Sequence, residues 1–121
     1  MIIGTFAFSD CYGLKYVKIS NIVMAMNDSV LQHCYCLVKV IIPDSVTTIG
    51  ITAFQNCYNL RQTIFLSTTP PTLANANAFA GIPASNQIYV PDASLNAYKT
   101  ATNWVTYANH IHPMSALGAS P

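Results

Sequence analysis

The sequence predicts an α/β repeat solenoid, because the chain repeats itself every 23 residues and each repeat contains a short segment with strand character. The repeat keeps several apolar and aromatic columns in register over three copies. These columns are Phe8, Leu31 and Phe54; Cys11, Cys34 and Cys57; Tyr12, Tyr35 and Tyr58; Leu14, Leu37 and Leu60; and Ile19, Ile42 and Phe65. A constant period of this length is typical of stacked coils, in which each repeat buries its apolar side against its neighbours.

Residues 1–66 are expected to form three such coils. Each coil should contain one strand, at residues 16–20, 39–42 and 62–66, since these segments are apolar or alternate between apolar and polar side chains. Alternation directs Val17 and Ile19 into the core of the first coil, and Thr63 and Phe65 into that of the third. Pro43 should end the second strand, because proline cannot donate a hydrogen bond to a strand ladder.

Residues 67–113 are expected to form an altered fourth coil and a C-terminal cap. Ala78 and Phe79 restore an Ala-Phe pair at a step of 25, and residues 88–91 restore the strand. Asp92 is predicted to be the N-cap of a short helix, and residues 111–113 a last strand. Residues 114–121 are small and polar enough for a flexible tail.

Composition excludes several classes of function. Apolar residues make up 52% of the 121 residues and charged residues 7%, and the net charge is +1. Such a small charge gives no reason to expect nucleic acid as a partner. We find neither an apolar run of the roughly 18 residues needed for membrane insertion nor a signal peptide.

The four cysteines are interpreted as free thiols rather than as a disulfide framework. Cys11, Cys34 and Cys57 share the period of the core leucines, so they should form a buried column. Cys36 lies outside this column, which would make it the thiol most open to oxidation.

The outward positions of the predicted strands form the candidate binding surface, which a solenoid presents on its concave face. Aromatic, basic and aliphatic residues together are typical of a binding surface, although an ordinary solvated sheet face has the same pattern. The candidate ligand-binding residues are Tyr16, Lys18, Lys39, Ile41, Gln62, Ile64 and Tyr89, with Gln87 beside them.

The tyrosine column of Tyr12, Tyr35 and Tyr58 admits two interpretations. It could be an exposed stripe that binds sugar rings or protein, or a structural ladder; the shared core period favours the ladder. His110 and His112 could pair at a metal, but two ligands do not make a structural zinc site. We expect no metal, no cofactor and no enzyme activity, because no phosphate loop or nucleophile elbow is present.

Residues 41–60 (IIPDSVTTIGITAFQNCYNL) resemble the BspA-type leucine-rich repeat almost position for position. Residues 88–99 (IYVPDASLNAYK), followed by Trp104 and Ile111, are similar to the C-terminal cap of that family. The resemblance implies a right-handed solenoid with one short parallel strand per coil. It also implies a cell-surface or secreted protein without catalytic activity, involved in adhesion and host interaction.

The resemblance and the repeat pattern lead to two functional hypotheses. In the first, the chain is an adhesion module that recognises a host protein or glycan, its extracellular partner, through the concave face. In the alternative, it is a structural cap or spacer of a longer surface protein, with no ligand of its own. The first coil begins in mid-repeat, so Met1 is expected to be an internal start; otherwise the open N-terminal coil would self-associate.

Overall fold

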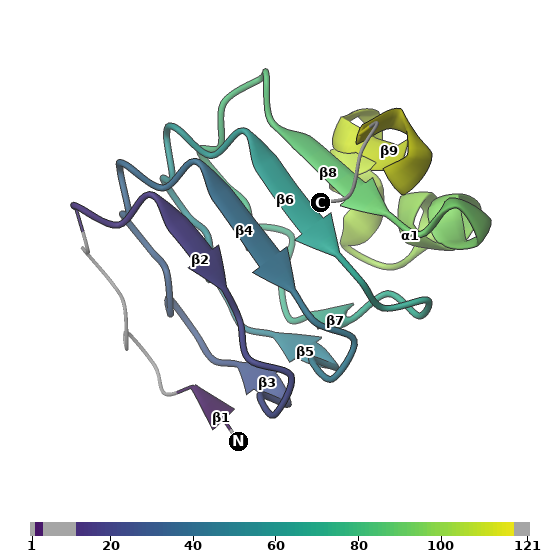
Figure 1. Ribbon diagram of the computed structural model, residues 1–121, viewed down its shortest axis with the longest axis horizontal. Coiled ribbons are helices and arrows are strands. Elements are labelled where there is room, and N and C mark those ends of the chain that lie inside the picture. The colour runs from purple at the N-terminus through teal and green to yellow at the C-terminus, as the bar shows by residue number, and fades with distance from the viewer. Residues whose placement is uncertain (1, 4–11, 118–121) are drawn as a thin grey trace.

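The computed structural model describes residues 2–3 and 12–117 of the chain. Two parallel sheets wind around a common core, and the chain alternates between them (Figure 1). The shorter sheet contains β1 (Ile2–Ile3), β3 (Ala25–Met26), β5 (Thr48–Ile49) and β7 (Thr72–Leu73). The longer sheet contains β2 (Tyr16–Lys18), β4 (Lys39–Ile42), β6 (Gln62–Phe65), β8 (Gln87–Val90) and β9 (Ile111–Pro113).

The strand register reproduces the sequence period. Tyr16 of β2 pairs with Lys39 of β4, Lys39 with Gln62 of β6, and Gln62 with Gln87 of β8. The repeat solenoid predicted from the sequence is therefore confirmed. The expectation of one strand per coil is wrong, because each coil also contributes a two-residue strand to the shorter sheet.

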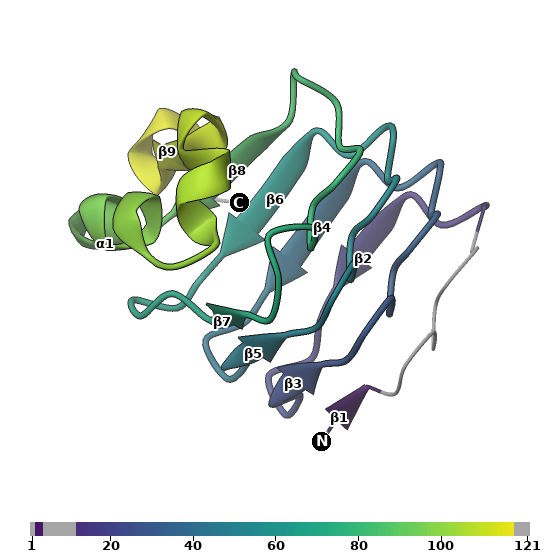
Figure 2. The same ribbon diagram turned by 180° about the vertical axis from the view of Figure 1, so that it is seen from behind.

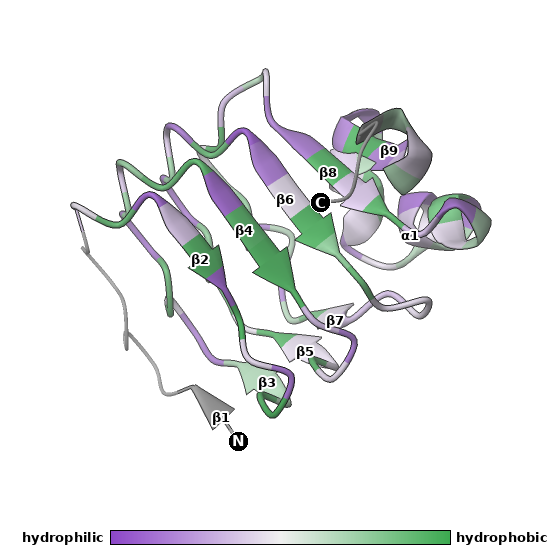
Figure 3. Ribbon diagram, in the orientation of Figure 1, coloured by the Kyte–Doolittle hydropathy of each residue, from purple (hydrophilic) through white to green (hydrophobic). Residues whose placement is uncertain are grey.

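The core lies between the two sheets. Val40, Ile42 and Phe65 are completely buried, as are Leu37 and Leu60, whereas Leu14 of the first coil is half-buried. Strands β4, β6 and β8 begin with a hydrophilic residue and end with a hydrophobic one, as Figure 3 shows most clearly for β4 and β6. Thr63 is buried as expected, and its hydroxyl oxygen accepts a hydrogen bond from the Asn86 side chain at 3.3 Å. Ile19 is also buried, whereas Val17 is only half-buried.

The C-terminal helical segment packs against the β8 end of the stack (Figure 2). It contains η1 (Asp92–Ser94), α1 (Leu95–Thr100) and η2 (Trp104–His110). Trp104 joins this segment to the coils: its ring centroid lies 5.0 Å from that of Phe65, and its indole N–H donates to the Pro71 carbonyl at 2.7 Å. Tyr98 packs edge-on against Trp104 and donates to the Ser67 carbonyl.

Two features of the C-terminal region differ from the sequence-based expectations. Asp92 is not a helix N-cap; its carboxylate instead accepts the backbone N–H of Ser115 at 3.0 Å, and the N-cap position of η1 is Pro91. The expected tail begins with η3 (Met114–Leu117), and the rest of it lies outside the described residues. The last strand is confirmed, because β9 pairs with β8 in parallel. The domain boundaries, the handedness and the capping role stay predictions.

Candidate functional site

The candidate ligand-binding face is not a uniformly exposed surface. Ile64 is completely buried, and Ile41 and Tyr89 are only 6% exposed. These three side chains form a small apolar cluster of their own, separate from the core, and Met114 of η3 packs against it. The expectation that they are exposed is therefore wrong. The physical reason is that apolar side chains on adjacent strands, about 4.8 Å apart, cover one another and are then covered by η3.

The remaining members of this face stay accessible to solvent. Tyr16 is 54% exposed and Lys18 is exposed, whereas Lys39 and Gln62 are half-buried. The Lys39 ammonium lies 5.7 Å from the centre of the Tyr16 ring, within the range of a cation–π contact. Gln87 is exposed, and its side-chain oxygen accepts the Tyr89 hydroxyl. The open part of the face thus lies over β2 and the starts of β4 and β6.

A hollow of about 500 Å³ adjoins this open part. It lies where β2 and β4 end, and its lining includes Lys18, Ile41, Pro43, Asp44 and Leu66. Apolar side chains therefore lie there beside one positive group, on Lys18, and one negative group, on Asp44. Such a hollow suits an amphipathic side chain of a partner molecule, because it offers apolar contact beside polar groups.

The tyrosine column forms a stacked ladder at the turns that precede the strands of the longer sheet. The ring centroids of Tyr12 and Tyr35 are 5.1 Å apart, and those of Tyr35 and Tyr58 are 5.3 Å apart. The rings are nearly parallel, with interplanar angles of 12° and 9°. Tyr12 and Tyr58 are both 54% exposed and Tyr35 is 36% exposed. The column is therefore a stacked ladder that is also exposed to solvent, and binding by it stays a prediction.

A second exposed column lies three residues after each tyrosine of the ladder, and sequence reasoning missed it. It consists of Lys15, Val38 and Arg61, all of which are exposed. Backbone hydrogen bonds fix the column: the Val38 N–H donates to the Lys15 carbonyl at 2.8 Å, and the Arg61 N–H donates to the Val38 carbonyl at 2.9 Å. The signal that could have revealed it is the constant spacing of 23.

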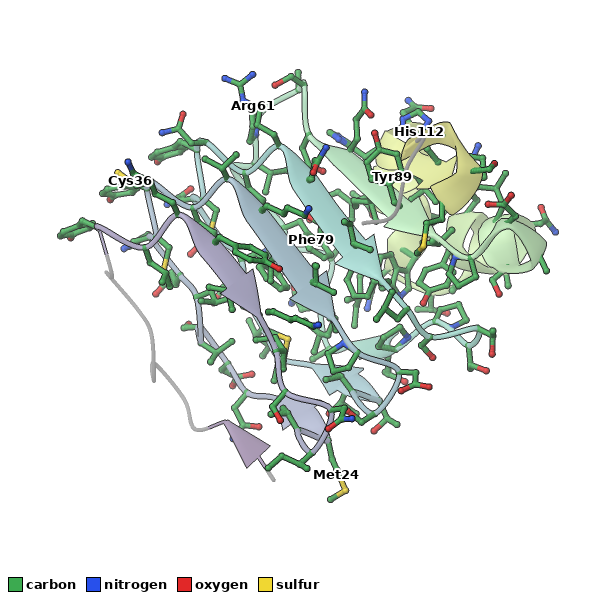
Figure 4. All side chains as sticks on the ribbon, in the orientation of Figure 1. Met24, Cys36, Arg61, Phe79, Tyr89 and His112 are labelled. Carbon is green, nitrogen blue, oxygen red and sulfur yellow. The ribbon has the colours of Figure 1, made fainter. Side chains whose placement is uncertain are left out.

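We call the tyrosine ladder and this second column together the rim. Its members are Tyr12, Lys15, Tyr35, Val38, Tyr58 and Arg61. Arg61 projects from the edge of the longer sheet at which the strands begin, and Cys36 lies along the same edge (Figure 4). The rim therefore borders the open part of the candidate face.

The cysteine column is confirmed at the positions that the structure describes. Cys34 and Cys57 are buried and form no disulfide bond, Cys36 is half-buried, and Cys11 lies outside the described residues. Burial raises the pKa of the Cys57 thiol to about 12, and the neighbouring Cys34 contributes in the same direction. The Cys57 thiol donates to the Leu31 carbonyl at 3.2 Å. A protonated, enclosed thiol is not suited to nucleophilic chemistry.

The two candidate metal ligands lie in different elements. His110 ends η2, and its Nδ1 lies 2.9 Å from the Asn86 carbonyl oxygen. His112 lies in β9, with its ring 6.2 Å from that of Tyr89. Among residues 2–3 and 12–117, no three histidine, cysteine or acidic side chains gather in a way that could hold a metal ion. In the same part of the chain, no helix has the length and apolar character needed to cross a membrane.

Comparison with known proteins identifies the repeat. Residues 1–104 match the family model of the BspA type leucine rich repeat region (6 copies). No curated protein matches the chain. Proteins of this repeat family are generally non-catalytic scaffolds for protein interaction and are typically associated with surfaces. Because the match covers most of the chain and the strands repeat at the same period, this protein belongs to the BspA-type leucine-rich repeat family.

Proposed function

We propose that this chain is a non-catalytic binding module of a cell-surface or secreted protein, and that it recognises an extracellular protein or glycan of a host. The observation that carries the proposal is the open part of the sheet face. There, the repeat aligns Tyr16, Lys39 and Gln62 side by side on adjacent strands, with Lys18 at the end of β2. Aromatic and basic side chains on a rigid scaffold are typical of interaction surfaces.

The open part of this face is small, which bears on affinity. Three strands at about 4.8 Å spacing span roughly 10 Å between the outer strand axes, well below the width of a standard protein interface. A single copy of this surface should therefore bind weakly. Repetition over further coils, or over several copies on a cell, would raise the apparent affinity through effective concentration.

Binding to an array of extracellular-matrix proteins and mucosal glycans tests the proposal. The double variant Lys18→Glu/Lys39→Glu reverses both basic groups of the face, and Lys99→Glu on α1 is the matched control. We expect the double variant to lose the signal of the native chain, with circular dichroism unchanged, and Lys99→Glu to keep it. Equal binding by all three proteins would exclude the sheet face as the binding site.

The alternative function is a structural cap or spacer of a longer surface protein. The burial of Ile41, Ile64 and Tyr89 favours it, because Met114 covers the apolar part of the face that would otherwise contribute most to binding. A spacer has no ligand, so the native chain would bind nothing on the array at any protein concentration used.

A further inference from the structure

The rim concentrates positive charge although the whole chain carries a net charge of only +1. Lys15 and Arg61 belong to the rim, and Lys39 is the first residue of β4 beside it, so three of the five basic residues of the chain lie along one edge. Lys15 and Arg61 lie on either side of Val38, about 10 Å apart at the usual strand spacing. The described acidic residues lie elsewhere, after β3, β4 and β8; they are Asp28, Asp44 and Asp92.

The tyrosine ladder restricts the kind of partner that the rim can accept. Tyr35 has the ring of Tyr12 on one face and that of Tyr58 on the other. The exposed surface of Tyr35 must therefore lie mainly along its ring edge and hydroxyl end. Sugar rings stack on open aromatic faces, which an internal member of the ladder does not offer. Ring edges carry partial positive charge and attract acceptor groups, so the ladder adds to the field of the two cations.

Apolar contact is available between the charges. Val38 is 41% exposed and lies between Lys15 and Arg61, and Tyr16 on the adjoining strand is 54% exposed. Exposed tyrosine and arginine side chains beside an aliphatic side chain match the composition of protein–protein interfaces.

From this combination we infer that the rim docks an acidic segment of a partner polypeptide. Carboxylates of the segment pair with Lys15 and Arg61, and an apolar side chain between them contacts Val38 and the tyrosine edges. Arginine favours such pairing because its planar group can donate two parallel hydrogen bonds to one carboxylate. This inference rests on the proposed function as a binding module, and it names the partner class and a surface distinct from the sheet face.

The test uses the full chain and a fluorescein-labelled synthetic peptide of alternating glutamate and tyrosine. A peptide with lysine in place of glutamate is the control probe. We expect fluorescence anisotropy to detect binding of the acidic peptide only, with an affinity that falls as sodium chloride is raised, because salt screens exposed charges. The double variant Lys15→Glu/Arg61→Glu should lose at least about tenfold in affinity. The matched charge reversal Lys99→Glu should keep the native affinity.

A second variant and a second probe separate the remaining outcomes. Tyr35→Ala removes the middle of the ladder and should weaken peptide binding several-fold, whereas an unchanged affinity would overturn the role of the ladder. Heparin, a sulfated polysaccharide, competes for the same cations. If heparin binds and the peptide does not, the polypeptide inference is overturned, but the binding module stands. If the array described above yields a ligand and neither probe binds, the rim inference alone fails. The function itself fails only if the array is also negative.

Discussion

Replacing Phe79 by alanine tests whether the coils and the C-terminal helical segment form one cooperative unit. The Phe79 side chain, labelled in Figure 4, is completely buried. It lies at the centre of an aromatic network. Its ring stacks on Phe54 at 4.9 Å and meets Tyr107 edge-on at 5.2 Å. It also lies 5.8 Å from Trp104 and 6.3 Å from Phe65. The network therefore joins the third and fourth coils to η2.

The loss of stability expected for Phe79→Ala follows from the burial of its ring. Removing a fully buried phenylalanine ring costs about 3–5 kcal/mol, the sum of the lost transfer free energy and the cavity left behind. Phe79→Leu keeps most of the side-chain volume but loses the ring contacts, so we expect it to lower the free energy of unfolding by about 1.5 kcal/mol. Val105→Ala is the matched control, because Val105 is 60% exposed and its truncation should change the free energy of unfolding by less than about 0.5 kcal/mol.

Urea unfolding followed by two probes measures this effect. Far-ultraviolet circular dichroism reports on the strands, and the fluorescence of Trp104, the sole tryptophan, reports on the helical segment. If the unit is cooperative, both transitions shift together to lower urea in Phe79→Ala. Separate transitions, or a loss below about 1 kcal/mol, would refute the argument that the aromatic network couples the segment to the coils.

Three further predictions concern a glycine, the thiols and a carboxylate. Gly50→Ala should lower the free energy of unfolding by about 1–3 kcal/mol, since a Cβ atom at this position would lie 2.4 Å from the backbone nitrogen of Asp28 in the preceding coil. Gly13→Ala is the control in the same urea assay. It should be nearly neutral, because a Cβ atom there would have no other atom within 4 Å. At pH 8, Cys36 should react with a thiol reagent well before Cys57, whose pKa is raised to about 12 by burial; equal rates in peptide mapping would contradict this. The hydrogen bond from the Ser115 backbone N–H in η3 lowers the pKa of the Asp92 carboxyl group below its ordinary value of 3.8. This hydrogen bond therefore holds above about pH 4, and it is lost as the pH falls through the lowered pKa and the carboxylate is protonated. The chemical shift of that amide proton should titrate with a midpoint below 3.8, and Asp92→Asn should abolish the titration.

The periodic part of the fold was predictable because one residue type at each column serves one structural purpose. Leu37 and Leu60 are buried in successive coils, and the strands at residues 39–42 and 62–65 fall where the apolar pattern placed them. The shorter sheet was not predictable in the same way. A strand of two residues, such as β5, is too short for alternation to be seen, and only the backbone pairing across coils defines it.

The candidate site was predicted less well, because exposure depends on contacts between distant segments. Alternation correctly places Ile64 on the opposite side of the sheet from Thr63, but it cannot show that Ile41, Tyr89 and Met114 cover it. Asp92 illustrates the same limit. Its position before a helix is typical of an N-cap, yet the carboxylate bonds to an N–H that lies 23 residues later.

These differences confine the proposed binding to the open part of the sheet face and to the rim beside it. The apolar side chains of the face already contact one another and Met114, so a partner would gain little further burial there. The rim keeps its aromatic edges and two cations accessible, and its backbone is held by hydrogen bonds between successive coils. A backbone that is ordered before binding loses less conformational entropy when the partner docks, which favours affinity. In this chain, the starts of the strands and the rim beside them are therefore better suited to recognition than the apolar part of the face.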